Sequence, residues 1–376
     1  MRVLLTHSQL ETRTGAELYV HDVAVGLLAR GHQPVAYAPK LGALAELLRS
    51  ETVPVAEALA DVGDPPDVIH GQDNHVLLTA LLHWPTVPVV RVLHGWFDER
   101  PVPFPRIRHF VAVDDTVRDR ALGEWGVPAA ALATVRNFVD LRRFTPRGPL
   151  PATPARALVF SNYAAAHLPV IRGACEAHGI AVDVAGASTG AAVERPEALL
   201  GRYDIVFAKA RCAMEAMASG AAVILCDASG LGPLVTSAAF DDLHRMNFGL
   251  RSLSRPLTEA GVAAAVARYD PADAARVTER LRAVASLDDA VDQLIAIYER
   301  AIASTAATAP DAAEDMRAAA AYLAALAPRL AWTQSTRALA YQMLRRAYFG
   351  AQQLPGVRRL LPARVAAQRL QRKLQR

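Results

Sequence analysis

Short apolar runs alternate with helix-length amphipathic stretches over about the first 300 residues of the chain. The clearest helix is predicted over residues 16–30, where Leu18, Val20 and Val23 begin a helical repeat and Gly31 provides a stop. Strands are predicted at residues 3–7, 34–39, 67–70, 87–94, 109–115 and 133–139. Alternation of this kind favours a parallel sheet covered by helices on both faces.

The pattern breaks once and then restarts. Residues 147–154 hold three prolines and one glycine, which is typical of an interdomain linker. Strands are predicted again at 156–162, 181–185, 203–208 and 222–227, with helices at 164–178 and 212–219 and a helical region over 256–303. The expected fold class is therefore α/β, with Rossmann-like, doubly wound parallel-sheet domains at 1–146 and 155–300. These domains should face a cleft in which ligands bind beyond the carboxyl ends of the strands.

The end of the chain differs in composition from the rest. Residues 301–310 are rich in Ala, Thr and Ser and predict a flexible joint, and residues 311–376 predict a helical basic tail. From Met316 onward there are twelve Arg and Lys residues and no Asp or Glu, and subtracting their charges from the net charge of +4 leaves −8 for residues 1–315. An apolar stripe through Leu360, Ala367 and Leu374 makes the last helix amphipathic. The 335–376 tail is thus expected at an anionic membrane surface, with a solvated or self-docked helix as the alternative.

The composition of the chain limits the cellular compartments and the classes of partner that can be expected. Hydrophobic residues make up 52% of the chain, which is enough for a sizeable core. Three cysteines are too few for a disulfide framework, the chain begins with a strand pattern rather than a signal peptide, and no apolar run reaches the length of a membrane span. Aromatic residues do not interleave with the arginines of the tail, so no nucleic-acid partner is expected. We expect a cytoplasmic protein that is peripheral on the inner face of the cell membrane.

Candidate chemistry gathers in residues 204–227, which predict a strand, a tight turn, a short helix and a second buried strand. The start of such a helix has unpaired backbone N–H groups and a partial positive charge, and phosphates are its usual guests. Lys209 and Arg211 flank the turn, where they can neutralise a diphosphate, and Glu215 lies one helical turn deeper, where it can accept hydrogen bonds from a ribose. The alternative is an ordinary strand–helix unit with two surface cations.

Several segments together resemble the family 4 retaining glycosyltransferases of GT-B fold, over roughly residues 1–300. Residues 14–32, beginning Thr-Gly-Ala-Glu, are similar to the Gly-Gly-Ala-Glu loop and first helix of the family. Residues 89–95 resemble the strand that ends in its active-site histidine, and residues 110–114 and 135–146 resemble the segments that lead to the interdomain crossing. Residues 215–223 are similar to its Glu-Ala-Met-Ala core. The resemblance implies transfer of a sugar from a nucleotide-sugar, with retention, to a glycan, lipid-linked or small-molecule acceptor (a hexosyltransferase-like enzyme of class EC 2.4).

The resemblance also assigns roles to single residues. His94, at the carboxyl end of a strand, is expected to contact the transferred sugar or the acceptor, although a structural role is the common alternative for such a histidine. Glu215 corresponds to the ribose partner, and glycine before the first helix would let the backbone approach the donor phosphates. Turn roles are the alternatives for the glycines and the asparagine of this set. The expected donor-binding residues are Gly15, Asn137, Lys209, Arg211, Glu215 and Gly230.

The sequence departs from the family pattern in its phosphate-binding residues. The family has two glutamates separated by seven residues, and the earlier one is replaced here by Phe207. The turn before the helix is shortened, and the first strand of the second half leads into residues 160–167, which lack the Arg and Lys that grip the diphosphate. Lys209 and Arg211 are therefore expected to supply the missing cations from the other loop.

No cofactor or metal is expected, and the nucleotide-sugar is a co-substrate. The chain contains no Asp-x-Asp, the metal-diphosphate ligand of the other large glycosyltransferase fold. Two alternatives stay open: a catalytically degenerate GT-B binding or assembly subunit of a polysaccharide pathway, and a sugar-nucleotide epimerase. The epimerase would need acids and bases on both sides of the cleft, for which the sequence offers only Asp73, His94 and Asp98. A dinucleotide-dependent dehydrogenase is disfavoured because no Gly-x-Gly-x-x-Gly follows the first strand.

Overall fold

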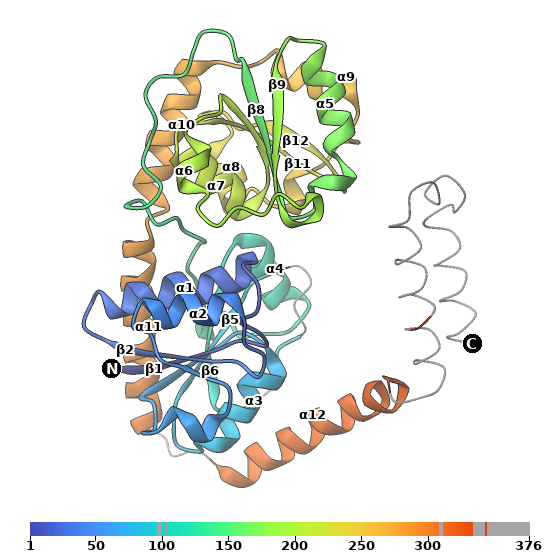
Figure 1. Ribbon diagram of the computed structural model, residues 1–376. Coiled ribbons are helices and arrows are strands. Elements are labelled where there is room, and N and C mark those ends of the chain that lie inside the picture. Colours follow the sequence, from blue (N-terminus) through green and yellow to red (C-terminus); the bar gives the residue numbers. More distant parts are fainter. Residues whose placement is uncertain (96–99, 103, 308–310, 334–342, 344–376) are drawn as a thin grey trace. The chain divides into compact units, whose positions relative to one another are not determined.

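The computed structural model describes residues 1–95, 100–102, 104–307, 311–333 and 343. The chain separates into two compact units, residues 1–310 and residues 311–376, which are considered one at a time. The larger unit contains two sheets, each with helices on its faces (Figure 1). We call the half built on the first sheet the first lobe and the half built on the second sheet the second lobe. The expected pair of doubly wound α/β domains is confirmed.

The first lobe is a parallel sheet of seven strands in the order β3-β2-β1-β4-β5-β6-β7. Its central strands consist of residues that are almost fully buried on both faces, which is why they appear in the sequence as continuous apolar runs. The strands are β1 (Arg2–Thr6), β2 (Gln33–Tyr37), β3 (Val55–Ala56), β4 (Val68–Gly71), β5 (Val89–Leu93), β6 (Ile107–Ala112) and β7 (Leu132–Thr134). The helices between them are α1 (Gly15–Leu28), α2 (Ala43–Ser50), α3 (Asn74–His83) and α4 (Asp115–Gly123).

The second lobe has five strands in the order β12-β11-β10-β8-β9. The strands are β8 (Arg156–Phe160), β9 (Ala181–Ala185), β10 (Ile205–Ala208), β11 (Ala222–Asp227) and β12 (Gly230–Leu234). The helices are α5 (Leu168–Glu176), α6 (Glu197–Leu200), α7 (Ala210–Ala218), α8 (Phe240–Arg245), α9 (Glu259–Val266) and α10 (Pro271–Val284). Strand β12 pairs antiparallel with β11, so this sheet is not wholly parallel. Short 3₁₀ helices are η1 (Leu59–Val62), η2 (Ala129–Ala131), η3 (Ala164–Ala166), η4 (Ala187–Thr189) and η5 (Leu250–Ser252).

Helix α11 (Leu287–Ala307) returns to the first lobe (Figure 1). Its buried face, which includes Val291, Leu294 and Tyr298, belongs to the same hydrophobic core as α1 and β1. The crossing is fixed by a hydrogen bond from the Val139 amide to the Ala285 carbonyl, 2.9 Å. The predicted domain of residues 155–300 thus gives up its last helix to the first lobe, and this helix also covers most of the predicted joint at 301–310.

The second unit contains α12 (Ala312–Thr333). Asp311 caps its start by accepting from the Ala313 amide at 2.8 Å, and the helix continues past Pro328 rather than ending there. The predicted basic amphipathic helix at the end of the chain, and the 335–376 tail apart from Met343, lie outside the described residues. Within the described part of the chain, no helix is both long and apolar enough to span a membrane.

Candidate functional site

Two adjoining cavities lie between the lobes, at the carboxyl ends of the strands. Their volumes are about 660 Å³ and about 330 Å³, and both are lined by His94 and Gly95 of the first lobe and by Ala210 and Asn247 of the second. The start of α4 and residues 246–253 complete the larger cavity, and the start of α1 lines the smaller. This is the place where doubly wound sheets bind their ligands.

His94 follows β5 and faces both cavities. The His94 and Tyr19 rings pack edge to face, with ring centroids 4.4 Å apart and planes at 78°. Burial holds the pKa of His94 well below its usual value, and the nearby His70, His7 and Arg91 lower it further. The imidazole is therefore neutral near pH 7, which suits a hydrogen bond to a sugar hydroxyl rather than an ion pair with a phosphate.

The first lobe brings two further predicted residues, Gly15 and Asn137, to the smaller cavity. Gly15 begins α1, whose start is stabilised by Glu17, because the Glu17 carboxylate accepts from the Thr14 amide at 2.9 Å. A Cβ placed at Gly15 would meet no atom within 4 Å, so packing within the protein does not require a glycine there, and its role beside the donor phosphates stays a prediction. The Asn137 amide donates to the Val113 carbonyl at 3.2 Å, which holds this residue beside the end of β6.

Lys209 lies at the end of β10 and forms part of the wall of the larger cavity. Its ammonium group is paired with the Asp227 carboxylate at the end of β11. Burial alone would raise the pKa of Asp227, but hydrogen bonds from Lys209 and Ser229 lower it below its usual value. Lys209, the first of the two cations predicted to bind the donor diphosphate, therefore lies at the larger cavity with its charge already balanced by Asp227.

Arg211 lines the smaller cavity, and its guanidinium is bound by two carboxylates. Its Nε donates to Oε1 of Glu215 at 2.7 Å, and Nη2 donates to Asp22 of helix α1. The Glu215 side chain is only 4% exposed and is not among the groups that line either cavity. Burial raises the pKa of Glu215 against the opposing effect of Arg211. The roles of Arg211 and Glu215 in donor binding stay predictions, and their carboxylate–guanidinium pairing was not predicted.

The turn that leads into α7 has an unusual backbone. Ala210, Asn247 and Phe248 have φ values of 49°, 56° and 48°, which lie in the left-handed region that side chains disfavour. The Ala210 amide donates to the Phe248 carbonyl at 2.9 Å, so the two strained segments hold each other. Ala210 and Asn247 face both cavities, and such strain is concentrated at functional sites. The sequence feature that could have indicated the left-handed residue at the start of α7 is the shortened turn before that helix.

Gly230 begins β12 and does not line the cavities, although its neighbour Ser229 does. A Cβ at Gly230 would come within 2.8 Å of the Arg255 carbonyl and 3.0 Å of the Leu253 carbonyl. The glycine therefore lets a neighbouring segment pack closely against the new strand. Its role as a donor contact stays a prediction.

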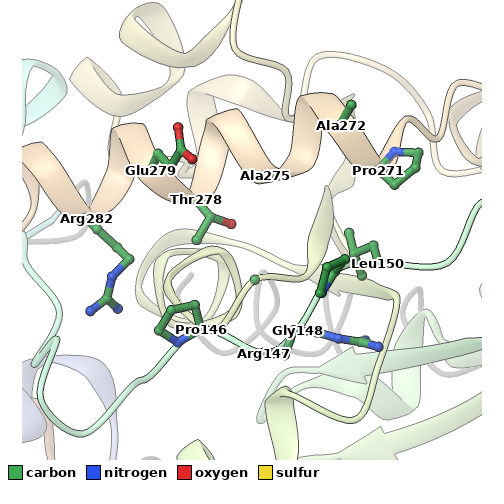
Figure 2. A pocket seen from close by; sticks show the side chains of 12 residues that line it. Pro146, Arg147, Gly148, Leu150, Pro271, Ala272, Ala275, Thr278, Glu279 and Arg282 are labelled. Atoms are coloured by element: carbon green, nitrogen blue, oxygen red, sulfur yellow. The ribbon is translucent and has the colours of Figure 1, made fainter.

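A third cavity, of about 630 Å³, shares no lining residue with these two (Figure 2). It is lined by the linker residues 146–150 and by α10. Its two arginines are already engaged, because Arg147 donates to Asp204 at 3.0 Å and Arg282 donates to the Phe144 carbonyl at 2.7 Å. The cavity thus reflects the packing of the linker, away from the strand ends that carry His94 and Lys209.

Comparisons with known proteins place this geometry in context. The sequence profile of Glycosyltransferase Family 4 matches residues 13–143, a segment that contains Gly15, His94 and Asn137. No curated protein sequence matches the chain. Among the described residues, no group of three or more His, Cys, Asp or Glu side chains could hold a metal ion.

Solved structures share the fold at low sequence identity. A glycosyltransferase from Rickettsia africae ESF-5 has a TM-score of 0.60 at 14% identity, covering 80% of this chain and 98% of that one. HepE from Anabaena in complex with UDP has a TM-score of 0.59 at 14% identity, with coverages of 80% and 99%. Sucrose-phosphate synthase from Thermosynechococcus elongatus has a TM-score of 0.56 at 15% identity, with coverages of 81% and 100%. The expected GT-B architecture is confirmed.

Proposed function

The chain carries a Glycosyltransferase Family 4 domain within a GT-B fold, and from this premise we propose that it transfers a glycosyl group from a nucleotide-sugar to an acceptor. The observation that carries the proposal is the interlobe cavity, which has neutral His94 on one side and the start of helix α7 on the other. Because HepE was crystallised with UDP and with UDP-glucose, a uridine diphosphate sugar is the first donor to test.

The proposed reaction retains the configuration of the anomeric carbon. The bond from that carbon to the donor diphosphate breaks, and the acceptor oxygen forms a bond on the same face while its proton passes to the departing phosphate. Negative charge grows on the diphosphate, where the α7 amides and Lys209 can stabilise it. His94 would hydrogen-bond the sugar, which becomes electron-poor as the bond lengthens. A glycan, lipid-linked or small-molecule acceptor would occupy the part of the cleft on the first-lobe side.

Lys209 gives the sharpest test of the donor site. We expect Lys209→Ala to weaken UDP binding about tenfold, because a charge-assisted contact is worth about 1.5–3 kcal/mol. Asp227→Asn should tighten binding, because it releases the ammonium group that Asp227 now neutralises. Isothermal titration calorimetry with UDP measures both. Lys40→Ala is the matched control, since Lys40 is paired with the exposed Glu11 and does not line the cavities. Unchanged affinity in the Lys209 variant would reject the proposed role.

We also propose that transfer needs no divalent metal. Cations of the protein and helix amides would supply the stabilisation that a metal gives elsewhere. Once a thermal-shift screen of nucleotide-sugars has identified the donor, transfer should persist after dialysis against EDTA. Activity that is lost on dialysis and restored by Mg²⁺ or Mn²⁺ would contradict this prediction.

One observation favours a second candidate, a catalytically degenerate binding subunit of a polysaccharide pathway. Lys209 and Arg211 are both held by carboxylates, and a phenylalanine replaces the first glutamate of the family pattern. Such a subunit would bind a nucleotide-sugar without forming product. Single-turnover assays with the bound donor and a panel of acceptors separate the two candidates. The epimerase alternative has no such support, because Asp98 lies outside the described residues and Asp73 accepts from the Ser8 amide at 2.7 Å.

A further inference from the structure

A buried chain of charges joins the two lobes beside the smaller cavity. Asp22 of α1 binds Arg211 of α7, and Arg211 also binds Glu215 on its own helix at 2.7 Å. The side chains of Asp22, Arg211 and Glu215 are 2%, 14% and 4% exposed. Charges buried this deeply are stable only while they are paired, so the pairing constrains where α7 can lie relative to α1.

The Asp22 carboxylate is itself held in place on its other side. His21 Nδ1 lies 2.8 Å from Oδ1 of Asp22, while Oδ2 accepts from Arg211. The second ring nitrogen of His21 lies 2.8 Å from a Glu51 carboxylate oxygen. Both oxygens of Asp22 are thus engaged, which fixes its rotamer and the direction in which it receives the guanidinium.

The ion pair between Asp22 and Arg211 lies where the starts of α1 and α7 come together. Gly15 and Ala16 at the start of α1 line the same cavity as Ala210 and Arg211 at the start of α7. A ligand in that cavity therefore meets two helix N-termini at once, each with a partial positive charge, although the Ala210 amide is already engaged by the Phe248 carbonyl. Arg211 donates through two edges of its guanidinium to carboxylates, so its contribution is directed at the wall rather than at the ligand.

We infer that Asp22 is a positioning residue for the proposed transfer: by holding Arg211 across the lobes, it aligns the α7 amides and Lys209 with His94. This inference rests on the proposed function, and it reassigns Arg211 from a donor contact to the partner that Asp22 holds. Asp22 touches no substrate in this arrangement. It acts through the placement of the turn at residues 209–211, which belongs to the opposite lobe.

The test uses the full chain and compares Asp22→Asn with Asp22→Glu, which keeps the charge. The control is Glu124→Gln, which removes a carboxylate from an exposed ion pair with Arg120 on α4. Hydrogen exchange followed by mass spectrometry reports on residues 205–220, which belong to the second lobe and share no element with Asp22. Calorimetry with UDP, and with inorganic pyrophosphate, reports on the alignment of the phosphate-binding groups.

We expect Asp22→Asn to exchange faster over residues 205–220 and to bind both probes about 10- to 100-fold more weakly; the upper figure is the loss of rate that a misplacement of about 1 Å can cause. Asp22→Glu should recover part of the affinity, and Glu124→Gln should match the wild type.

If Asp22→Asn loosens only α1 and binds both probes normally, the inference is wrong. If the wild type binds neither probe, the proposed function fails instead, and the exchange over 205–220 still decides whether Asp22 aligns the lobes. If Asp22→Asn does not fold, Asp22→Glu is compared with the wild type instead. Hydrogen exchange over 205–220 and affinities that both equal those of the wild type would then show that Asp22 does not position the turn.

Discussion

An Arg211→Met variant should have a free energy of unfolding about 3–5 kcal/mol below that of the wild type, the usual cost of removing one partner from a buried ion pair. The variant leaves Asp22 and Glu215 buried without their shared cation. Burial alone would raise the pKa of Asp22, but Arg211 and His21 hold it well below its usual range. Without Arg211, the native state must either protonate these carboxylates or admit water to them.

Equilibrium urea unfolding at pH 7 measures the effect of this substitution. The triple variant Asp22→Asn, Arg211→Met, Glu215→Gln is the informative companion, because it removes all three charges together. It should recover a large part of the loss, since replacing a whole buried network with neutral groups is often nearly neutral. A loss below about 1 kcal/mol in Arg211→Met would mean that the pair behaves as an exposed one.

Acid should begin to destabilise this protein below about pH 6.5, where histidines of the unfolded chain take up protons. Burial, together with the nearby Arg91, lowers the pKa of His70 to about 3, so the ring takes up no proton in the native state near pH 5. In the unfolded chain the same ring takes up a proton near pH 6.5. The stability due to neutral His70 is therefore complete above pH 6.5 and is lost as the pH falls toward 3, at up to about 1.4 kcal/mol per pH unit. At pH 5 the loss from this residue is about 2 kcal/mol.

Urea unfolding of the wild type and of His70→Gln at pH 7.5 and pH 5.0 tests this prediction. Glutamine can keep a hydrogen bond to Tyr298, whose hydroxyl lies 2.6 Å from Nδ1 of His70, but it does not titrate. The difference in stability between the two pH values should therefore be about 2 kcal/mol smaller in the variant. The exposed His83 supplies the control His83→Gln, which should keep the full acid dependence. An equal acid loss in His70→Gln and wild type would show that His70 is not the group responsible.

Much of the fold could be predicted because most of its strands are buried apolar runs. β9 and β11 were predicted to the residue, and the other predicted strands differ from the structure by a few residues at their ends, where the apolar runs continue into turns. Strand β12 was missed, because the Gly-Leu-Gly-Pro that begins it carries turn residues and no alternation. The return of α11 to the first lobe was also missed. Helical periodicity shows that one face is apolar, but it does not show which sheet that face will cover.

The site could be predicted only in part. His94, Gly15 and Asn137 were chosen mainly from the family resemblance, and Lys209 and Arg211 from the turn before a predicted helix. The structure brings all five to the interlobe cavities. Their electrostatic state could not be predicted, because it depends on partners that are distant in the chain. Asp22 lies 189 residues before Arg211, and nothing in the sequence around either residue connects them. Sequence patterns report local geometry, whereas charge compensation is a property of the folded lobes.

The return of α11 bears on how the protein can be made. The hydrophobic core of the first lobe includes Leu287, Val291 and Tyr298, which the ribosome supplies only after the whole second lobe. During translation the first sheet therefore has part of one face uncovered until α11 is made, and exposed apolar surface of this kind makes a chain prone to aggregation. For the same reason, a gene fragment cut at the linker should yield an insoluble first half, and co-expressing the segment that encodes α11 should rescue it.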